Sequence, residues 1–276
     1  MQWRLSNSAE QIRLEKLFAS IGIDFTQPGF YDLPPFLKAE RADPRFLENY
    51  ARYVEARAYT DEELTSAKNK ITVAAATLEA IVAKDGRKGA CVDVSGMLGR
   101  MLDKLGVWNY VAKSTLTIAF PKSSGLGPSY FWAVDSGNFV APHAVVVAPP
   151  FGVVDLTAMH QNYRANQATY LKSPILAENW VPATWKPEDI ANTKILKELK
   201  NRKMSFDEFL NRQYGSMLER MRVFPAREVS LGESQLKYVI IAVAATAEPL
   251  EGITGYKPCG RTALDIFEKD IQSQLT

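Results

Sequence analysis

A change of apolar period at Gly89 constrains the fold of this chain more than any other feature of its sequence. Downstream of it, apolar residues recur every three or four positions: Val94, Met97, Leu98, Met101, Leu102 and Leu105. This spacing predicts a buried helix that begins near Cys91 and ends at Gly106. Three segments rich in β-branched and aromatic residues follow, at 107–120, 143–148 and 151–156. We therefore expect an α+β fold in which this helix packs on an antiparallel sheet.

Helical patterns flank this central region. Residues 8–21 repeat apolar positions at helical spacing, Asp43-Pro44 is typical of a helix start, and residues 60–63 form a capping box that opens a longer helix. Residues 27–35 hold three prolines and predict a loop. After 161 the chain returns to helical patterns, with a late strand near 235–245 and a terminal helix near 262–274.

The chain divides into two predicted parts. Residues 1–173 hold the helical N-terminal part and the helix-sheet core. Residues 174–276 form a mostly helical C-terminal extension that can pack on the same core. The proline- and tryptophan-bearing stretch 174–187 is the candidate linker between them.

Charge and composition exclude several classes of protein. The 33 Lys and Arg residues nearly balance the 31 Asp and Glu residues, so the sequence predicts no nucleic-acid partner and no membrane partner. The N-terminal residues lack the apolar region of a signal peptide, and the most apolar run, 238–247, is too short to span a bilayer. We expect a cytoplasmic protein, with oligomeric state left open. Two cysteines and two histidines without zinc-type spacing predict neither a disulfide framework nor a metal site, and no cofactor is implied.

Cys91 is the candidate nucleophile. The first turn of a helix offers free backbone N–H groups and a positive dipole end, which lower the pKa of a thiol placed there. Gly89 permits close approach of the backbone, and the N–H of Cys91 can help to hold a developing oxyanion. No upstream Gln or Trp is evident as a second oxyanion donor. Asp93, in the same turn, is expected to cap or pair locally.

His143 and Asp155 are the candidate base and its orienting carboxylate. They lie on two strands joined at Pro149-Pro150, which predicts a hairpin. A two-residue turn would pair Asp155 with Ala144 and point it away from His143, whereas a three-residue turn or a bulge would put both on one face. We therefore predict an odd-length turn around Pro150. A carboxylate within an apolar strand is costly unless it is paired, which favours a role for Asp155.

These motifs, taken in order, resemble the transglutaminase-like core of the papain-like superfamily. The matching segments are Gly89-Ala-Cys91-Val-Asp93, Leu102-Asp-Lys-Leu105-Gly106, His143-Ala-Val-Val146 and Val154-Asp155-Leu-Thr157, within residues 75–160. The resemblance implies a Cys91-His143-Asp155 triad that acts on a peptide, protein or small amide substrate through a thioester. Water as acceptor gives a peptidase or amidase, which we favour, and an amine gives a transglutaminase. The 52 residues from Cys91 to His143 are longer than the usual core, which predicts an insertion at 122–139.

Two alternatives remain open. Residues 87–93 are similar to the R-G-G-x-C-x-E motif of arylamine N-acetyltransferases, but Lys88 and Asp93 depart from it. A transglutaminase-like domain can also act as a non-catalytic binding or scaffold module. Among the remaining residues, Cys259 is expected to be incidental and His160 to lie on the surface. Residues 130–132 are aromatic and are expected to pack in the core rather than to line a substrate wall.

Overall fold

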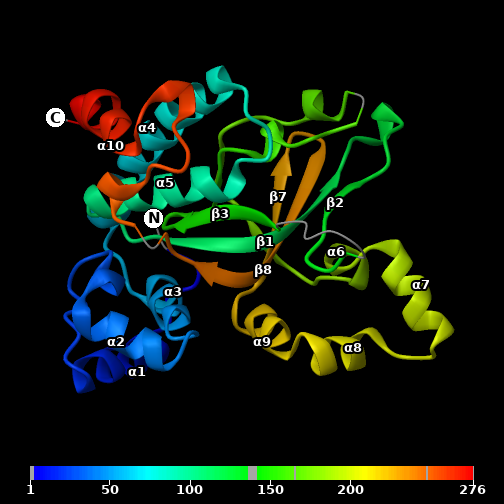
Figure 1. Cartoon of the computed structure of the whole chain (residues 1–276), viewed down its shortest axis with the longest axis horizontal. Helices are drawn as coiled ribbons and strands as arrows, with labels where there is room; N and C mark the ends of the chain where they lie inside the picture. Colours follow the sequence, from blue (N-terminus) through cyan, green and yellow to red (C-terminus); the bar gives the residue numbers. More distant parts are fainter. Residues whose placement is uncertain (1–2, 136–141, 165, 247, 276) are drawn as a thin grey trace.

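One antiparallel sheet organises the chain (Figure 1). The computed structural model describes residues 3–135, 142–164, 166–246 and 248–275. Within these ranges the strands lie in the order β5-β4-β3-β1-β8-β7-β6, and β2 pairs with the second half of β1. The strands are β1 Tyr110–Ala119, β2 Ser129–Phe131, β3 His143–Ala148, β4 Phe151–Asp155, β5 Ile175–Ala177, β6 Val181–Ala183, β7 Ala226–Leu231 and β8 Ser234–Ala244.

The helices gather in three groups around this sheet (Figure 1). The N-terminal group is α1 Ser8–Ser20, α2 Pro34–Ala42 and α3 Leu47–Ala56. The second group is α4 Asp61–Asp85, α5 Cys91–Lys104 and α10 Ala263–Ile266. The third group is α6 Pro187–Ile190, α7 Thr193–Asn201, α8 Phe206–Gln213 and α9 Gly215–Val223. This mixture of helices with an antiparallel sheet confirms the predicted α+β class. No helix in the described ranges is both long and apolar enough to cross a membrane.

The two faces of the central strand β1 pack against different helices. Its even-numbered residues Ala112 and Leu116 pack in one apolar cluster with α1 and α3. On the other face, Val111 packs in a second cluster with residues of α4 and α5. Farther along that same face, the Thr117 hydroxyl donates a 2.7 Å hydrogen bond to Asp189 of α6. The same face of β1 therefore contacts α5 near the start of the strand and α6 near its end.

Local sequence signals explain most helix starts. The capping box at Thr60 and Glu63 is formed, with the Thr60 hydroxyl accepting from the Glu63 N–H at 3.1 Å. The prediction that Asp43-Pro44 opens a helix is wrong, because α3 begins at Leu47 and the Asp43 carboxylate instead accepts the Arg45 N–H. The predicted loop at 27–35 runs into α2, since proline is compatible with the first helical positions.

The C-terminal part of the chain completes the sheet. Residues 174–187, the candidate linker, contain strands β5 and β6, and Trp180 between them is buried. Strand β8 pairs with β1 along nine residue pairs and so lies at the centre of the sheet. Residues 136–139 of the predicted insertion lie outside the described residues, and its first part contains β2.

A β-bulge, rather than an odd-length turn, brings the candidate base and carboxylate to one face. Ala148 pairs with Phe151, so the turn at Pro149-Pro150 has two residues and the prediction of an odd-length turn is wrong. The register then shifts, and Val146 pairs with Val154. The extra residue falls in β4 beside Gly152. This bulge is the alternative route to the same result, because it turns Asp155 toward the face of His143.

Gly152 makes the bulge compatible with its surroundings. A Cβ atom at this position would overlap the indole of Trp180. The Gly152 carbonyl also accepts a hydrogen bond from Arg227, whose side chain is fully buried and lies 4.9 Å from the Trp180 ring centroid. Arg227 in turn forms an ion pair with the buried Glu55 of α3. Trp180 and Arg227 are both fully buried.

Replacing Gly152 by alanine is expected to lower the free energy of unfolding by about 3 kcal/mol, the scale of overpacking in a rigid core. The matched control is Gly127→Ala, where a Cβ would enter open space and the expected change is within about 0.5 kcal/mol. Denaturant unfolding of the two variants measures the difference. Equal stabilities would show that the bulge tolerates a side chain.

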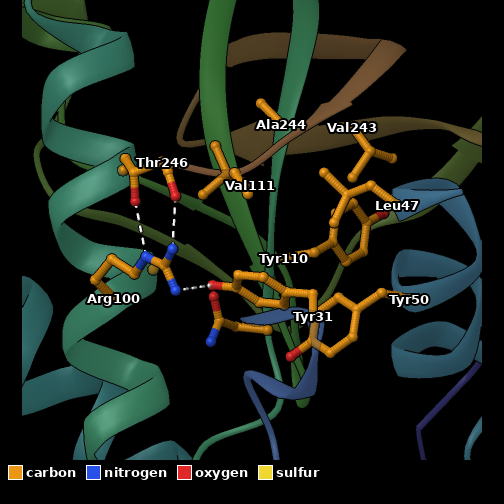
Figure 2. A pocket seen from close by; sticks show the side chains of 13 residues that line it. Tyr31, Leu47, Tyr50, Arg100, Tyr110, Val111, Val243, Ala244 and Thr246 are labelled. Atoms are coloured by element: carbon orange, nitrogen blue, oxygen red, sulfur yellow. Dashed lines mark hydrogen bonds between the residues drawn. The ribbon is translucent and has the colours of Figure 1, made fainter. Parts of the chain in front are cut away.

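Arg100 fixes α5 to two distant segments (Figure 2). All five of its N–H groups are used. They donate to the side chain and carbonyl of Thr246, to the Tyr31 hydroxyl and to both oxygens of Asp32. The cavity beside these groups has a volume of about 10 Å³, enough for at most one water molecule. We therefore interpret this contact as a structural support for α5 and not as a ligand site.

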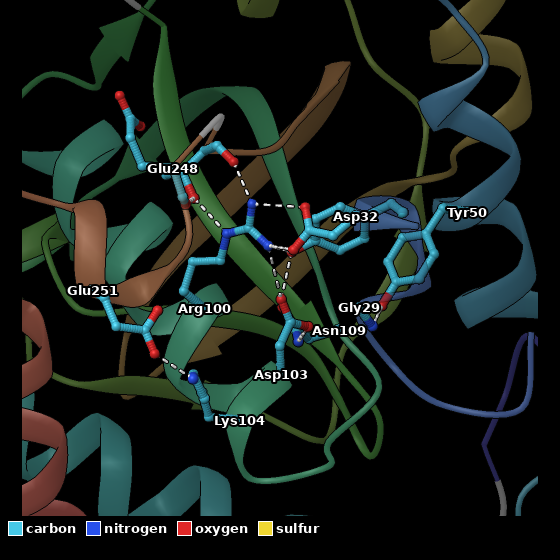
Figure 3. A network of polar contacts seen from close by, with 11 residues as sticks. Gly29, Asp32, Tyr50, Arg100, Asp103, Lys104, Asn109, Glu248 and Glu251 are labelled. Atoms are coloured by element: carbon cyan, nitrogen blue, oxygen red, sulfur yellow. Dashed lines mark hydrogen bonds and ion pairs between the residues drawn. The ribbon is translucent and has the colours of Figure 1, made fainter. Parts of the chain in front are cut away.

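Asp103 extends this network on the same helix (Figure 3). Its carboxylate accepts hydrogen bonds from the Tyr31 hydroxyl and from the Asn109 side chain, and it lies 3.8 Å from Arg100. Burial raises the pKa of Asp103 to about 7, although Tyr31 and Arg100 oppose the shift. The orientation of α5, and with it the place of its first residue, therefore depends on a buried charged cluster.

Candidate active site

Cys91 is the first residue of α5, as the sequence predicted. Its preceding residue, Ala90, provides no side-chain cap, so the first N–H groups of the helix keep their donor capacity. Gly89 adopts a left-handed conformation with φ of 71° and donates its N–H to the His160 carbonyl at 3.1 Å. This turn places the thiol at the positive end of the helix, where a thiolate is stabilised.

His143 and Asp155 form a direct pair in the interior. The distance from His143 Nε2 to Asp155 Oδ2 is 2.6 Å, and both residues are only 1% exposed. Because an ionised carboxylate can only accept, Nε2 carries the proton. Nδ1 is then the nitrogen available to a thiol, and it is buried without a hydrogen-bond partner among the described residues. The predicted pairing of these two residues is therefore present.

Asp155 is held from several directions. Its Oδ1 accepts the backbone N–H groups of Thr157 and Ala158 at 2.8 and 2.9 Å. Its Oδ2 accepts, besides His143, the hydroxyl of Tyr238 on β8 at 3.0 Å. Burial raises the pKa of Asp155, but the charge of His143 and these donors lower it more, so the carboxyl stays ionised. The carboxylate is therefore fixed in both orientation and charge.

Asp155 and Cys91 both favour the charged form of His143. Burial lowers the pKa of His143, but Asp155 has the larger opposite effect, and the pKa is raised to about 10. Burial raises the pKa of the Cys91 thiol, but the His143 imidazole and the Ala144 backbone N–H lower it below its usual range. Both shifts favour a thiolate beside an imidazolium, which is the reactive form of a cysteine nucleophile.

Aromatic side chains surround the imidazole. The ring centroids of Phe131 and Tyr238 lie 6.1 and 6.3 Å from that of His143, and Tyr163 meets Phe131 edge-on. Phe131 also packs against the apolar core, as expected. Its neighbours Tyr130 and Trp132 stack on each other at 5.5 Å and remain partly exposed. Phe131, Tyr163 and Tyr238 keep water away from the His143-Asp155 pair and so strengthen the interaction between the two residues.

The other predicted residues take mostly local roles. Asp93 pairs with Arg87 at 3.0 Å, which confirms the expected local pairing. The expectation that His160 lies on the surface is wrong, because it is largely buried and bonds Glu79 at 2.8 Å. Cys259 is exposed in a turn held by Asp85. Neither of these last two side chains contacts Cys91, His143 or Asp155 by any described interaction.

Sequence reasoning missed Tyr238. A tyrosine within an apolar strand is typical of core packing, and its carboxylate partner lies 83 positions earlier in the chain. Only the pairing of β8 with β1, which no local pattern encodes, brings the two together. No second oxyanion donor besides the N-terminal N–H groups of α5 can be assigned from the described contacts.

Comparisons with known proteins add no family assignment. Among the described residues, no group of three or more His, Cys, Asp or Glu side chains is arranged to hold a metal ion. No protein-family model, curated protein or solved structure matches this chain.

Proposed function

We propose that this chain is a cysteine-dependent acyl-transfer enzyme that acts through a thioester on Cys91. The observation that carries the proposal is the buried 2.6 Å contact between His143 and Asp155, combined with a thiol whose pKa is lowered by the same imidazole. We further propose that α5 together with β1, β3 and β4 forms a transglutaminase-like core. The helix-borne cysteine and the strand-borne histidine and aspartate support that assignment.

The first half-reaction forms the thioester. The Cys91 thiolate attacks the carbonyl carbon of an amide, and the new S–C bond places negative charge on the carbonyl oxygen. The free N–H groups of the first α5 turn are suited to hold this oxygen. The His143 imidazolium then gives its proton to the amide nitrogen, the C–N bond breaks and the amine leaves. Asp155 keeps the imidazole in the required tautomer throughout.

The second half-reaction releases the acyl group. The neutral His143 imidazole takes a proton from water, whose oxygen attacks the thioester carbon. The C–S bond breaks and Cys91 leaves as thiolate, again beside an imidazolium. The balance is one amide and one water converted to one carboxylic acid and one amine. An amine in place of water gives transfer instead of hydrolysis, and we propose hydrolysis as the simpler outcome.

Intact-protein mass spectrometry after incubation with a peptide and amide library tests the proposal. We expect a transient acyl adduct on Cys91 in the Cys259→Ser protein and none in the same protein with Cys91→Ala. Addition of an amine distinguishes transfer from hydrolysis by the product formed. Incubation with acetyl-CoA tests the acetyltransferase alternative, which requires an acetyl adduct at Cys91. A thiol at Cys91 no more reactive than a free cysteine would instead support a scaffold role.

A further inference from the structure

Lys113 lies on the central strand at an unusual place for a lysine. It pairs with Ala144 of β3 and with Ala242 of β8. Residues paired across antiparallel strands point to the same face, so Lys113 shares a face with two small alanine side chains. Two residues before it, Val111 packs in the cluster with α5, and four residues after it, Thr117 contacts α6. Lys113 therefore lies between the areas covered by α5 and α6.

This position is next to the nucleophile. The Ala144 backbone N–H contributes to lowering the pKa of the Cys91 thiol, and the Ala144 carbonyl accepts the Ser95 hydroxyl at 3.0 Å. The first two turns of α5 thus lie over Ala144, whose direct cross-strand neighbour is Lys113. The Cβ atoms of such neighbours are about 5 Å apart. A lysine side chain is longer than that distance, so the Lys113 ammonium group can extend past Ala144 toward Cys91.

Lys113 has no counter-ion among the described residues. It is partly buried, and neither an ion pair nor a hydrogen bond involves its ammonium group within the described ranges. By contrast, Lys237 on the neighbouring strand is paired with Asp189. A partly buried cation without an anion is unfavourable, and an anionic ligand relieves that cost.

A second unsatisfied group lies on the same face. The hydroxyl of Thr115, two residues along β1 from Lys113, is fully buried and has no hydrogen-bond partner in the described part of the chain. Thr115 also marks the point where β1 changes partner, from β3 at residues 110–114 to β2 at residues 116–118. Two polar groups on this face of β1, the Lys113 ammonium and the Thr115 hydroxyl, are therefore without a partner in the described part of the chain.

We propose that Lys113 binds a carboxylate of the substrate, so that the enzyme acts on acyl donors carrying an anionic group close to the reacting carbonyl. This inference rests on the proposed function and names its substrate class. It makes Lys113 a specificity-determining residue, and it assigns no chemical step to the lysine.

The test compares two alkylating reagents at Cys91 in the Cys259→Ser protein. Iodoacetate carries a carboxylate beside its reacting carbon, whereas iodoacetamide is neutral and of similar size. Lys113→Met is expected to lower the ratio of the iodoacetate rate to the iodoacetamide rate by about fivefold, the scale of one partly screened ion pair. Lys113→Arg should keep the ratio. Lys122→Met, which removes an exposed lysine beyond the end of β1, should also keep it.

The outcomes separate this inference from the function on which it rests. A ratio that is unchanged in Lys113→Met, or that falls equally in Lys122→Met, overturns the role of Lys113 while Cys91 stays a reactive thiol. A wild-type Cys91 that reacts with neither reagent rejects the proposed function and the substrate class together. The iodoacetamide rate reports an intact site in each variant, and Lys113→Gln carries the same comparison if the methionine variant does not fold.

Discussion

Replacing His143 by glutamine is expected to slow the alkylation of Cys91 by iodoacetamide at pH 6 at least about 100-fold. Burial raises the pKa of the thiol, and the imidazole is the main group that lowers it. Without His143 the pKa rises toward or above its usual value, and each unit of pKa removes tenfold of the thiolate at acidic pH. The rate is measured in a Cys259→Ser background by mass spectrometry of the alkylated protein.

The effect of His143→Gln on the alkylation rate depends on pH. A lowered thiol pKa means that the wild-type thiolate persists below the pH at which an ordinary cysteine becomes protonated. The difference between wild type and His143→Gln should therefore be largest at acidic pH and shrink as the pH rises through the pKa of the unassisted thiol. His160→Gln is the matched control, because this second histidine pairs with Glu79 and not with the thiol. Identical profiles for wild type and His143→Gln would reject the triad.

Replacing Arg100 by methionine is expected to lower the free energy of unfolding by about 3–5 kcal/mol, the cost of breaking a buried charge pair. The Arg100 side chain is 5% exposed, and its loss leaves Asp103 and Thr246 without their cationic partner. The same substitution removes the link between α5, Tyr31 and the segment after β8 (Figure 2). Chemical denaturation of wild type and variant measures the loss.

Two comparisons make this second prediction specific. Lys104→Met, on the same helix, breaks only an exposed ion pair with Glu251 and should cost at most about 1 kcal/mol. The folded-state pKa of Asp103 is raised to about 7 by burial, so the folded protein holds that proton more tightly than the unfolded chain. At pH 8 the Asp103 carboxylate is ionised and needs a cationic partner, whereas at pH 5 it is protonated. The loss of stability in Arg100→Met should therefore be larger at pH 8 than at pH 5. An equal loss of stability in Arg100→Met and Lys104→Met would contradict the structural role of the buried Arg100.

Local patterns predicted the parts of the site that neighbouring residues control. The apolar repeat after Gly89 gave the start of α5 at Cys91, and the strand patterns gave β3 and β4 with His143 and Asp155 at their ends. These signals are strong because periodicity reflects burial on one side of an element. The sequence predicts the bulge at Gly152 only indirectly: a one-residue shift is needed to bring His143 and Asp155 to one face.

Other features depend on contacts between distant segments. Lys113 in a strand looks like an ordinary solvent-facing residue until its alanine neighbours on β3 and β8 are known. The partly buried position of His160 follows from its contact with Glu79, 81 residues earlier. Helix α2 was missed because its two prolines match both a loop and a helix start, and tertiary packing of Phe36 decides between them. Single-sequence patterns do not encode such choices.

The central position of β8 in the sheet determines when the site can become complete during synthesis. This strand lies between β1 and β7, yet it follows Cys91 by more than 140 residues along the chain. A ribosome-bound chain that has released only α5, β1, β3 and β4 still has one open flank on β1, and Asp155 lacks its tyrosine partner. Long-range strand pairing is slow to form. The contacts around Cys91, His143 and Asp155 are therefore complete only after the last third of the polypeptide has been synthesised.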